Sequence, residues 1–224
     1  MKGKAIFSWS GGKESALALH EFRKNEHYEI TALLTTVTED YQRTSMHGVR
    51  RILLEEQARR AGLPLEEIFI SKNATSEEYG SKMRKVLEKH LASGVSSVVF
   101  GDVFLEDVRK YREKNLSGIG MKAVFPIWQK DTGELARAFI NLAFKAVTTC
   151  VDTNFLDKTF VGREFDERFL SDLPSGVDPC GENGEFHSFV YAGPVFRENV
   201  RFKKGETVLR GNRFYYCDLL PLAK

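Results

Sequence analysis

The first two thirds of this 224-residue chain alternate between short apolar runs and longer amphipathic stretches. Short apolar runs are typical of buried strands, whereas amphipathic stretches of about ten residues or more predict helices. Strands are expected at residues 4–9, 30–37, 68–71, 95–100, 123–125 and 146–151, and helices at residues 14–23, 49–61, 76–92, 105–116 and 132–144. Because strand–helix–strand units join parallel strands, the pattern predicts a doubly wound, mostly parallel α/β sheet with helices on both faces.

The regular alternation ends at about residue 153, where Gly, Pro and Asp become frequent. Two further strands are expected beyond that point, at residues 186–191 and 214–219. We therefore expect an α/β domain over residues 1–152 and a small C-terminal α+β lobe over residues 153–224. The lobe is expected to pack against the sheet rather than to form an independent domain.

The composition excludes several classes of protein. A hydrophobic content of 42% is enough for a sizeable core, and 33 Lys and Arg against 31 Asp and Glu give no support for a strongly basic nucleic-acid binder. No apolar run approaches the roughly 18 residues of a membrane-spanning helix, and the first one is too short for the core of a signal peptide, so a cytoplasmic location is expected. Cys150, Cys180 and Cys217 form no CxxC pair, which favours reduced thiols over a zinc or redox centre.

A glycine-rich segment joins the first expected strand to the first expected helix: residues 7–15 are Phe-Ser-Trp-Ser-Gly-Gly-Lys-Glu-Ser. Gly11 and Gly12 let the backbone approach a ligand closely, and the N–H groups at a helix start favour an anion. Ser10, Lys13 and Ser15 add hydroxyl groups and a positive charge. The segment therefore predicts a phosphate-binding loop, although an ordinary tight turn with Ser10 as the N-cap would use the same residue types. Its spacing matches neither the Walker A loop nor GxGxxG.

Residues 10–15 resemble the SGGxDS loop of the PP-loop N-type ATP pyrophosphatases, which have an adenine nucleotide alpha hydrolase-like fold. This resemblance implies that ATP is cleaved between its α and β phosphates, so that a carboxylate is adenylated and then attacked by an amine such as ammonia. ATP and Mg²⁺ would be the cofactors. Glu14 replaces the aspartate of the family, which keeps the charge but lengthens the side chain by one methylene.

Residues 178–189, Asp-Pro-Cys-Gly-Glu-Asn-Gly-Glu-Phe-His-Ser-Phe, resemble the GE(G/N)GE(F/Y) signature of the diphthine–ammonia ligase branch of this family. Softer similarities to that branch occur at residues 56–65, 101–103 and 125–128. Together they cover about residues 4–190 and imply a short form of a diphthine–ammonia ligase-like enzyme. The loop that begins at Gly101 differs from the eukaryotic and archaeal form, so diphthine and another carboxylate are both open as the substrate.

The resemblance also implies roles for individual residues. Lys13 would stabilise charge on the departing pyrophosphate, and Glu14 and Asp102 would act in catalysis and bind Mg²⁺, although Asp102 could instead cap the following helix. The nucleotide site is expected to comprise Ser8, Ser10, Gly11, Gly12, Lys13, Ser15, Thr35, Thr36, Met46, His47 and Gly101. The substrate site is expected to comprise Glu182, Asn183, Gly184, Glu185 and His187.

Plainer explanations remain open for some of these residues. Thr35 and Thr36 would also fit an ordinary strand, and His47 a hydrogen-bonded surface position. The basic–aromatic run at residues 109–112 would fit an acidic partner or RNA, and equally a solvated helix face.

Two other functions are also left open, namely a PP-loop tRNA-modifying enzyme and a non-catalytic sensor of ATP or AMP. The expected partners are ATP, ammonia and a carboxylate substrate that could be carried on a protein. We expect no membrane and no nucleic-acid partner, and a homodimer is left open.

Overall fold

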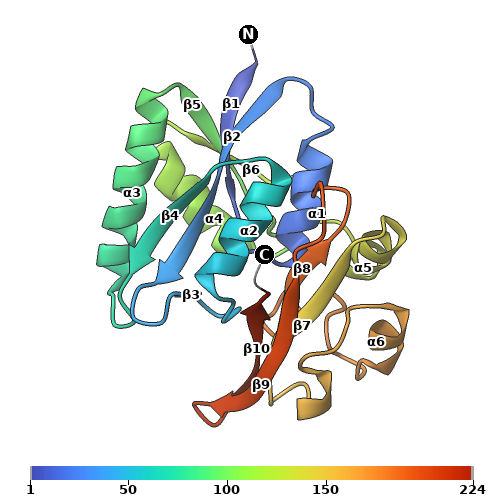
Figure 1. Cartoon of the computed structure of the whole chain (residues 1–224). Coiled ribbons are helices and arrows are strands. Elements are labelled where there is room, and N and C mark those ends of the chain that lie inside the picture. Colours follow the sequence, from blue (N-terminus) through green and yellow to red (C-terminus); the bar gives the residue numbers. More distant parts are fainter. Residues whose placement is uncertain (1, 223–224) are drawn as a thin grey trace.

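The computed structural model describes residues 2–222 and contains two β-sheets (Figure 1). The first sheet is built on five parallel strands: β1 (Gly3–Ser8), β2 (Tyr28–Thr38), β4 (Leu65–Ile70), β5 (Val95–Val99) and β6 (Lys122–Val124). Their order is β4-β2-β1-β5-β6, and the short antiparallel β3 (Arg43–Thr44) pairs with the end of β2. The order reverses at β1, because β2 lies on one side of it and β5 on the other. Open α/β sheets bind ligands at such a point, beyond the carboxyl ends of the strands.

Helices cover both faces of this sheet. The helices are α1 (Lys13–Phe22), α2 (Arg51–Ala61), α3 (Ser76–Ala92), α4 (Glu106–Ser117) and α5 (Thr132–Asn141). On one face, Phe7 packs in a core with Leu17 of α1 and Leu53 of α2. On the other face, Ile6 packs with Leu87 of α3 and Leu116 of α4. The expected doubly wound α/β fold is therefore confirmed.

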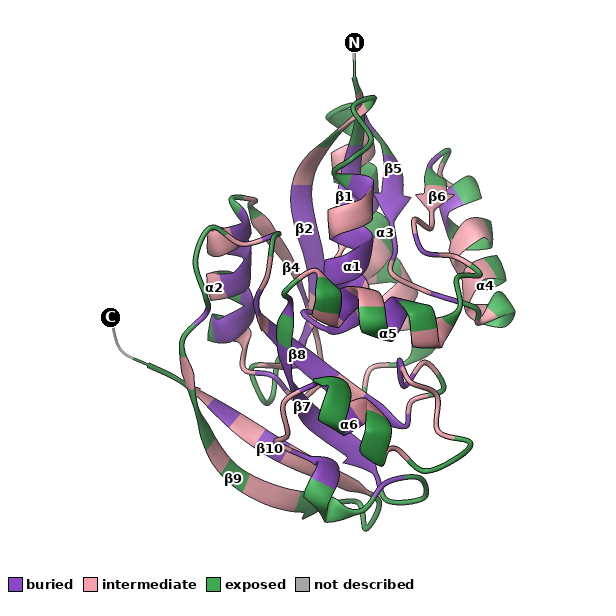
Figure 2. Cartoon of the chain, turned by 90° about the vertical axis from the view of Figure 1, so that its right-hand side faces the viewer, coloured by how far each residue is buried: buried purple, intermediate pink, exposed green. Residues whose placement is uncertain are grey.

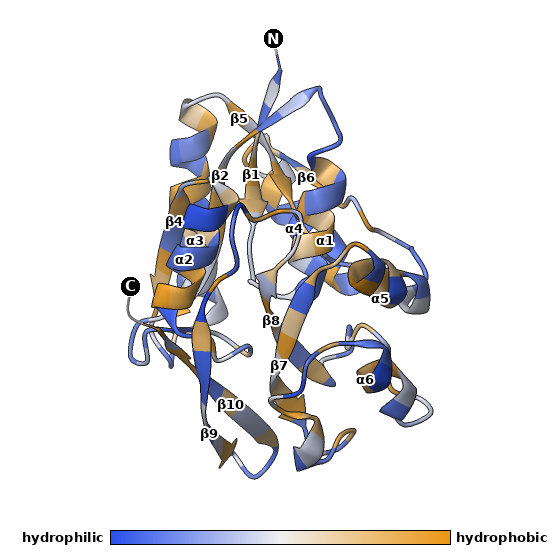
Figure 3. Ribbon diagram, turned by 45° about the vertical axis from the view of Figure 1, so that its right-hand side comes forward, coloured by the Kyte–Doolittle hydropathy of each residue, from blue (hydrophilic) through white to orange (hydrophobic). Residues whose placement is uncertain are grey.

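Local sequence explains where several helices begin and end. Gly62 ends α2 in the left-handed conformation with φ 69°, as the Gly-Leu-Pro sequence predicts. The Thr75 side chain accepts a hydrogen bond from the Glu78 amide at the start of α3, and Asp131 does the same for Glu134 in α5. The sequence of α2 alternates apolar and charged residues, so it buries one side and exposes the other (Figure 3).

The second sheet is antiparallel and lies in the C-terminal part of the chain. It comprises β7 (Lys145–Asp152), β8 (Phe186–Ala192), β9 (Phe202–Arg210) and β10 (Phe214–Pro221), in the order β8-β7-β10-β9. A short 3-10 helix (Lys158–Phe160) and α6 (Glu167–Asp172) lie between β7 and β8. The sequence analysis placed the β7 segment in the first domain, but its hydrogen bonds run to β8 and β10 instead. We therefore propose a boundary before β7 rather than after residue 152.

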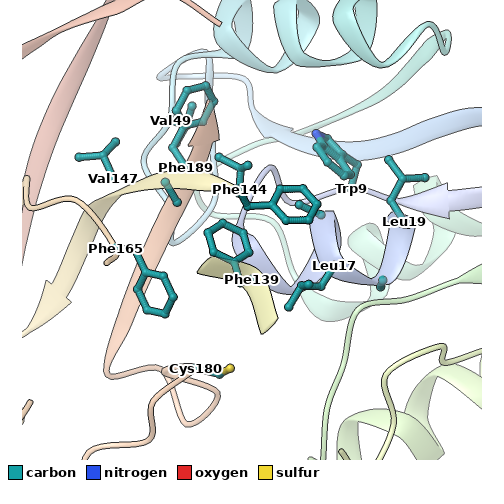
Figure 4. Close-up of a cluster of buried hydrophobic side chains, with 14 of the residues drawn as sticks. Trp9, Leu17, Leu19, Val49, Phe139, Phe144, Val147, Phe165, Cys180 and Phe189 are labelled. Carbon is teal, nitrogen blue, oxygen red and sulfur yellow. The ribbon is translucent and has the colours of Figure 1, made fainter. Parts of the chain in front are cut away.

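One continuous core joins the two sheets. Trp9 and Leu17 of the first part lie in the same buried cluster as Phe139, Val147 and Phe189 (Figure 4). Figure 2 shows the buried surfaces of β7 and β8 continuing toward α1. The C-terminal part thus packs against the first sheet without a separate core of its own.

The cysteines and the helices agree with two further expectations. Cys150, Cys180 and Cys217 are all buried free thiols. Within residues 2–222, no helix combines the length and the apolar content that crossing a bilayer requires.

Candidate functional site

The segment that joins β1 to α1 forms a compact loop at the carboxyl end of the central strand. Gly11 has φ +80°, a conformation that favours glycine. The Gly12 amide donates a hydrogen bond to Ser10 Oγ (3.2 Å), and the Ser15 hydroxyl donates one to the Gly12 carbonyl (2.9 Å). A Cβ atom on Gly12 would lie 2.9 Å from His47 Cε1, so a side chain at this position would force His47 to move. The loop over residues 10–15 is therefore compact and internally hydrogen-bonded; it is called the phosphate loop below for its predicted role, which stays a prediction.

Strand β8 of the second sheet holds this loop in place. The Val190 amide donates a hydrogen bond to the Gly11 carbonyl (2.9 Å), and the Lys13 amide donates one to Ser188 Oγ (3.2 Å). Residues more than 170 positions apart in the sequence thus fix the backbone of the loop.

Gln57 of α2 completes this attachment. Its side chain is fully buried, and its amide nitrogen donates hydrogen bonds to the carbonyls of Gly11 (3.0 Å) and Val190 (2.6 Å). Its carbonyl oxygen accepts a hydrogen bond from Trp9 Nε1 (2.8 Å). Sequence reasoning did not identify Gln57. The available signal was a polar residue within the apolar stripe of α2, beside Leu53, Leu54 and Ala58.

The Lys13 side chain is only 2% exposed and lies beneath the loop. Its Nζ is 2.7 Å from Glu14 Oε1 and 4.4 Å from the centre of the Phe186 ring. The ion pair and the aromatic ring hold a positive charge at the start of α1, inside the protein. The expected role of Lys13 toward a triphosphate stays a prediction.

Three carboxylates from distant segments lie near the start of α1. The loop after β5 packs directly on it, since a Cβ atom on Gly101 would lie 3.0 Å from the Glu14 carbonyl oxygen. Glu182 accepts a hydrogen bond from the Val103 amide (2.8 Å). Burial, followed by the charges of Glu14 and Asp102, raises the pKa of Glu182 to about 7. The structure thereby brings together Glu14, Asp102 and Glu182, which were predicted from three separate segments.

Asp102 does not cap α4, because the N-cap of that helix is Leu105 and it has no side-chain cap. Its carboxylate instead faces Arg112 of α4. Asp102 Oδ1 accepts a hydrogen bond from Arg112 Nη2 (3.0 Å), and Oδ2 lies 2.7 Å from Arg112 Nε.

No three His, Cys, Asp or Glu side chains within residues 2–222 form a ready-made metal site. This arrangement still fits Mg²⁺, which often binds through one or two carboxylates and completes its shell with water and substrate phosphates. Glu14 and Asp102 are the carboxylates that could hold it beside the loop.

The turn that contains Asn183 and Gly184 is held by its own acidic residues. Glu185 is only 1% exposed, and its Oε1 accepts hydrogen bonds from the Asp178 amide (3.2 Å) and from Asn183 Nδ2 (3.0 Å). Asp178 in turn accepts a hydrogen bond from the Glu182 amide (2.8 Å). Of the residues expected to contact substrate, Glu185 therefore holds the turn, whereas Glu182 reaches the loop after β5.

His47 and His187 lie side by side, with ring centres 4.6 Å apart. His47 Nδ1 lies 3.1 Å from the Ser188 carbonyl oxygen, so this nitrogen carries the proton and donates it. Burial lowers the pKa of His47 to about 4, and the pKa of His187 is also lowered by burial and by the neighbouring His47 and Lys13. Both imidazoles are therefore neutral at pH 7. The two residues were expected at separate parts of the site, and the fold makes them one pair.

A cavity of about 500 Å³ opens at the carboxyl ends of β1 and β2, within the range of small-molecule sites. Its lining includes five residues expected at the nucleotide site, namely Ser8, Ser10, Thr35, Thr36 and His47. The opposite wall comes from α3, from α4 and from the turn that follows α4, and it includes residues that sequence reasoning missed, namely Tyr79, Met83, Asn115 and Ile119. In the sequence, nothing distinguished these residues from others on or just after the predicted helices.

Met46 does not reach this cavity. Its side chain is 49% exposed and lines a separate groove that faces β9 and β10. Its backbone has φ +59°, which belongs to the turn between β3 and α2.

Comparison with known proteins agrees with this geometry. Residues 3–123 match the family model of the diphthamide synthase N-terminal domain, and residues 131–218 match that of the diphthamide synthase C-terminal domain. The interval between the two matches falls before α5, so both α5 and β7 lie within the match to the C-terminal domain.

Diphthine–ammonia ligase from Homo sapiens is 26% identical over 139 residues, which cover 59% of this chain and 51% of that protein. The enzyme of the same name from Mus musculus is 28% identical over 142 residues, with the same two shares. The chain thus spans about half the length of these curated relatives.

Among solved structures, the U34-tRNA thiolase NcsA from Methanococcus maripaludis with its 4Fe-4S cluster matches with a TM-score of 0.40 and 14% identity, over 63% of this chain and 58% of that chain. The family assignment depends on the domain matches alone. Because the first of them covers more than half of the sequence and the second most of the remainder, the chain belongs to the diphthamide synthase family.

Proposed function

We propose that this chain is an ATP-dependent ligase that cleaves ATP to AMP and pyrophosphate, adenylates a carboxylate and transfers it to ammonia. The observation that carries the proposal is the position of the loop at residues 10–15. At one end, Ser10 lines the 500 Å³ cavity, and at the other, Glu14 lies near Asp102 and Glu182. A nucleotide in the cavity would therefore have its phosphates beside the carboxylates that could hold Mg²⁺.

The residues present fit ATP. The cavity has a suitable size for a nucleoside, and Ser8, Thr35 and Thr36 offer it hydroxyl groups. The backbone at Gly12 packs closely on His47, which lines the same cavity, so the loop lies beside the proposed nucleotide site. The N–H groups and the dipole at the start of α1 favour the negative charge of the phosphates.

The chain's own residues would share the work of the reaction. Glu14 and Asp102 would hold Mg²⁺, which neutralises charge on the phosphates when it is bound. The buried ammonium group of Lys13 would add a fixed positive charge below the loop. Glu182, whose pKa is raised to about 7, would accept a proton from the attacking amine near neutral pH.

The named relatives suggest the substrate. Both are diphthine–ammonia ligases, so we propose that the carboxylate is diphthine or a closely related group carried on a protein. The turn over residues 178–185 would contact that substrate, because Glu182 extends from it to the loop after β5, which packs on the start of α1. The cytoplasmic location expected from the sequence stays a prediction, and a homodimer stays open.

The test is a product analysis with α-labelled ATP, Mg²⁺, ammonium and an elongation factor that carries diphthine. AMP and pyrophosphate in equal amounts, formed only with ammonium and the carboxylate present, would support the ligase. Formation of ADP would refute cleavage between the α and β phosphates. Tight binding of intact ATP with every carboxylate tested would favour a sensor, and turnover dependent on tRNA would favour RNA modification.

A further inference from the structure

Arg112 of α4 occupies the junction between the cavity and Asp102. Arg112 lines the cavity, and the Cζ of its guanidinium lies 4.3 Å from the centre of the Phe100 ring. The opposite edge of the same group faces Asp102. Phe100 and Asp102 flank Gly101, which contacts the start of α1. Arg112 is therefore near both the cavity and the phosphate loop.

The contact between Arg112 and Asp102 is close but poorly aligned. Nε lies 2.7 Å from Oδ2, yet neither of these two buried atoms has a hydrogen bond of acceptable geometry within residues 2–222. Only the 3.0 Å bond from Nη2 to Oδ1 is formed. The two groups therefore form a close ion pair with one aligned hydrogen bond, and a phosphate could compete for the guanidinium as a cation could for the carboxylate.

The cavity as a whole suits an anion. Of the described residues that line it, two are arginines and none is Asp or Glu. The second arginine, Arg84, has a side chain that is 62% exposed and pairs with Glu88 on its own helix. Lys13 is paired with Glu14 beneath the loop. Arg112 is thus the best-placed cation in the cavity wall for a ligand that extends toward the loop.

We propose that Arg112 recognises a phosphate of the bound nucleotide, and that its change of partner frees Asp102 to bind the cation. The planar guanidinium matches two phosphate oxygens, and the Phe100 ring restricts its orientation. This inference relies on the proposed function only for nucleotide binding, and not for turnover.

The experiment measures the affinities of the full-length protein for ATP, AMP and adenosine by calorimetry, without Mg²⁺. For Arg112→Gln we expect at least a tenfold loss of affinity for AMP and ATP and less than a twofold change for adenosine. Arg109→Gln is the matched control, since Arg109 lies on the same helix, packs on Phe125 and Trp128 and pairs with Glu113, but does not line the cavity. Arg112→Lys retains the charge without the planar fork and should fall between the wild type and Arg112→Gln. It also provides the test should Arg112→Gln not fold.

A second variant separates phosphate recognition from simple packing. Asp102→Asn weakens the competing partner, so without Mg²⁺ it should tighten AMP binding several-fold, and the double variant with Arg112→Gln should lose that gain. An equal loss of adenosine and AMP affinity in Arg112→Gln, or no gain in Asp102→Asn, would overturn the inference. If the wild type itself bound no nucleotide, the proposed function would fail, whereas unchanged AMP and ATP binding in Arg112→Gln would refute only the role of Arg112.

Discussion

Replacing Gln57 by Leu tests whether the buried amide holds the phosphate loop between the two sheets. The side chains are similar in volume, so the substitution removes hydrogen bonds while leaving little empty space. Trp9 Nε1 and the Val190 carbonyl each lose the bond that Gln57 supplies, whereas the Gly11 carbonyl keeps its bond from the Val190 amide.

The magnitude follows from the two groups left without their Gln57 bonds. A buried polar group without a partner costs about 1–3 kcal/mol, so two give about 2–6 kcal/mol. The more apolar side chain offsets about 1 kcal/mol of this loss. We therefore expect Gln57→Leu to lower the free energy of unfolding by about 3 kcal/mol.

Urea denaturation followed by tryptophan fluorescence would measure the loss, and Trp9 lies within the affected network. Gln42→Leu is the matched control, because the Gln42 side chain makes only exposed hydrogen bonds among the described residues: it donates one to the Glu39 carbonyl and accepts a long one from Arg51 Nη1 (3.5 Å). That variant should change the free energy of unfolding by less than about 0.5 kcal/mol. A loss below about 1 kcal/mol in Gln57→Leu would refute the reasoning, because the network would then contribute no more than a surface contact.

Three other predictions concern the loop and its titrating neighbours. Gly12→Ala should abolish ATP binding in calorimetry, since the added Cβ would clash with His47 at 2.9 Å, whereas Gly80→Ala on α3 meets no atom within 4 Å and should bind normally. Glu14→Asp should retain turnover within about tenfold in the pyrophosphate assay, a change of about 1.4 kcal/mol, and a larger loss would show that the longer side chain is required. The pKa of His47 is lowered to about 4, so its contribution to stability is present above pH 6.5 and lost as the pH falls toward 4. The pKa of Glu182 is raised to about 7, so its contribution is present below pH 4.5 and lost as the pH rises through 7. The two contributions have opposite pH dependence. As the pH is lowered from 6.5 to 4.5, the free energy of unfolding should therefore fall more steeply in Glu182→Gln than in the wild type, and less steeply in His47→Gln. Equal slopes in urea titrations across this range would contradict both assignments.

Much of the fold could be predicted because periodicity is a local property. The helix expected at residues 76–92 coincides with α3, and the left-handed Gly62 ends α2 as its sequence indicates. The partners of β7 could not be predicted, since a short apolar run has the same pattern in either sheet. Strand β9 was missed because its sequence, Phe-Lys-Lys-Gly-Glu-Thr-Val-Leu-Arg, is that of a polar edge strand with little apolar alternation.

In the candidate site too, features set by neighbouring residues could be predicted, whereas contacts between distant segments could not. The loop at residues 10–15 was predictable, because glycines and hydroxyl side chains between a strand and a helix indicate a tight turn from neighbouring residues alone. The pairing of His47 with His187 and of Asp102 with Arg112 depends on how distant elements pack. Met46 was placed at the nucleotide site by sequence proximity to His47, yet the turn directs it to another groove.

The attachment of the phosphate loop to β8 has a consequence for how the protein is made. Synthesis begins at the N-terminus, so β1, the loop and α1 leave the ribosome long before Ser188 and Val190, which hydrogen-bond to them. Contacts across such long stretches of chain form late, because closing the intervening loop costs entropy. We therefore expect the nascent first sheet to lack the contacts that fix this loop, and the proposed binding of ATP to require that the C-terminal strands have been synthesised and have docked.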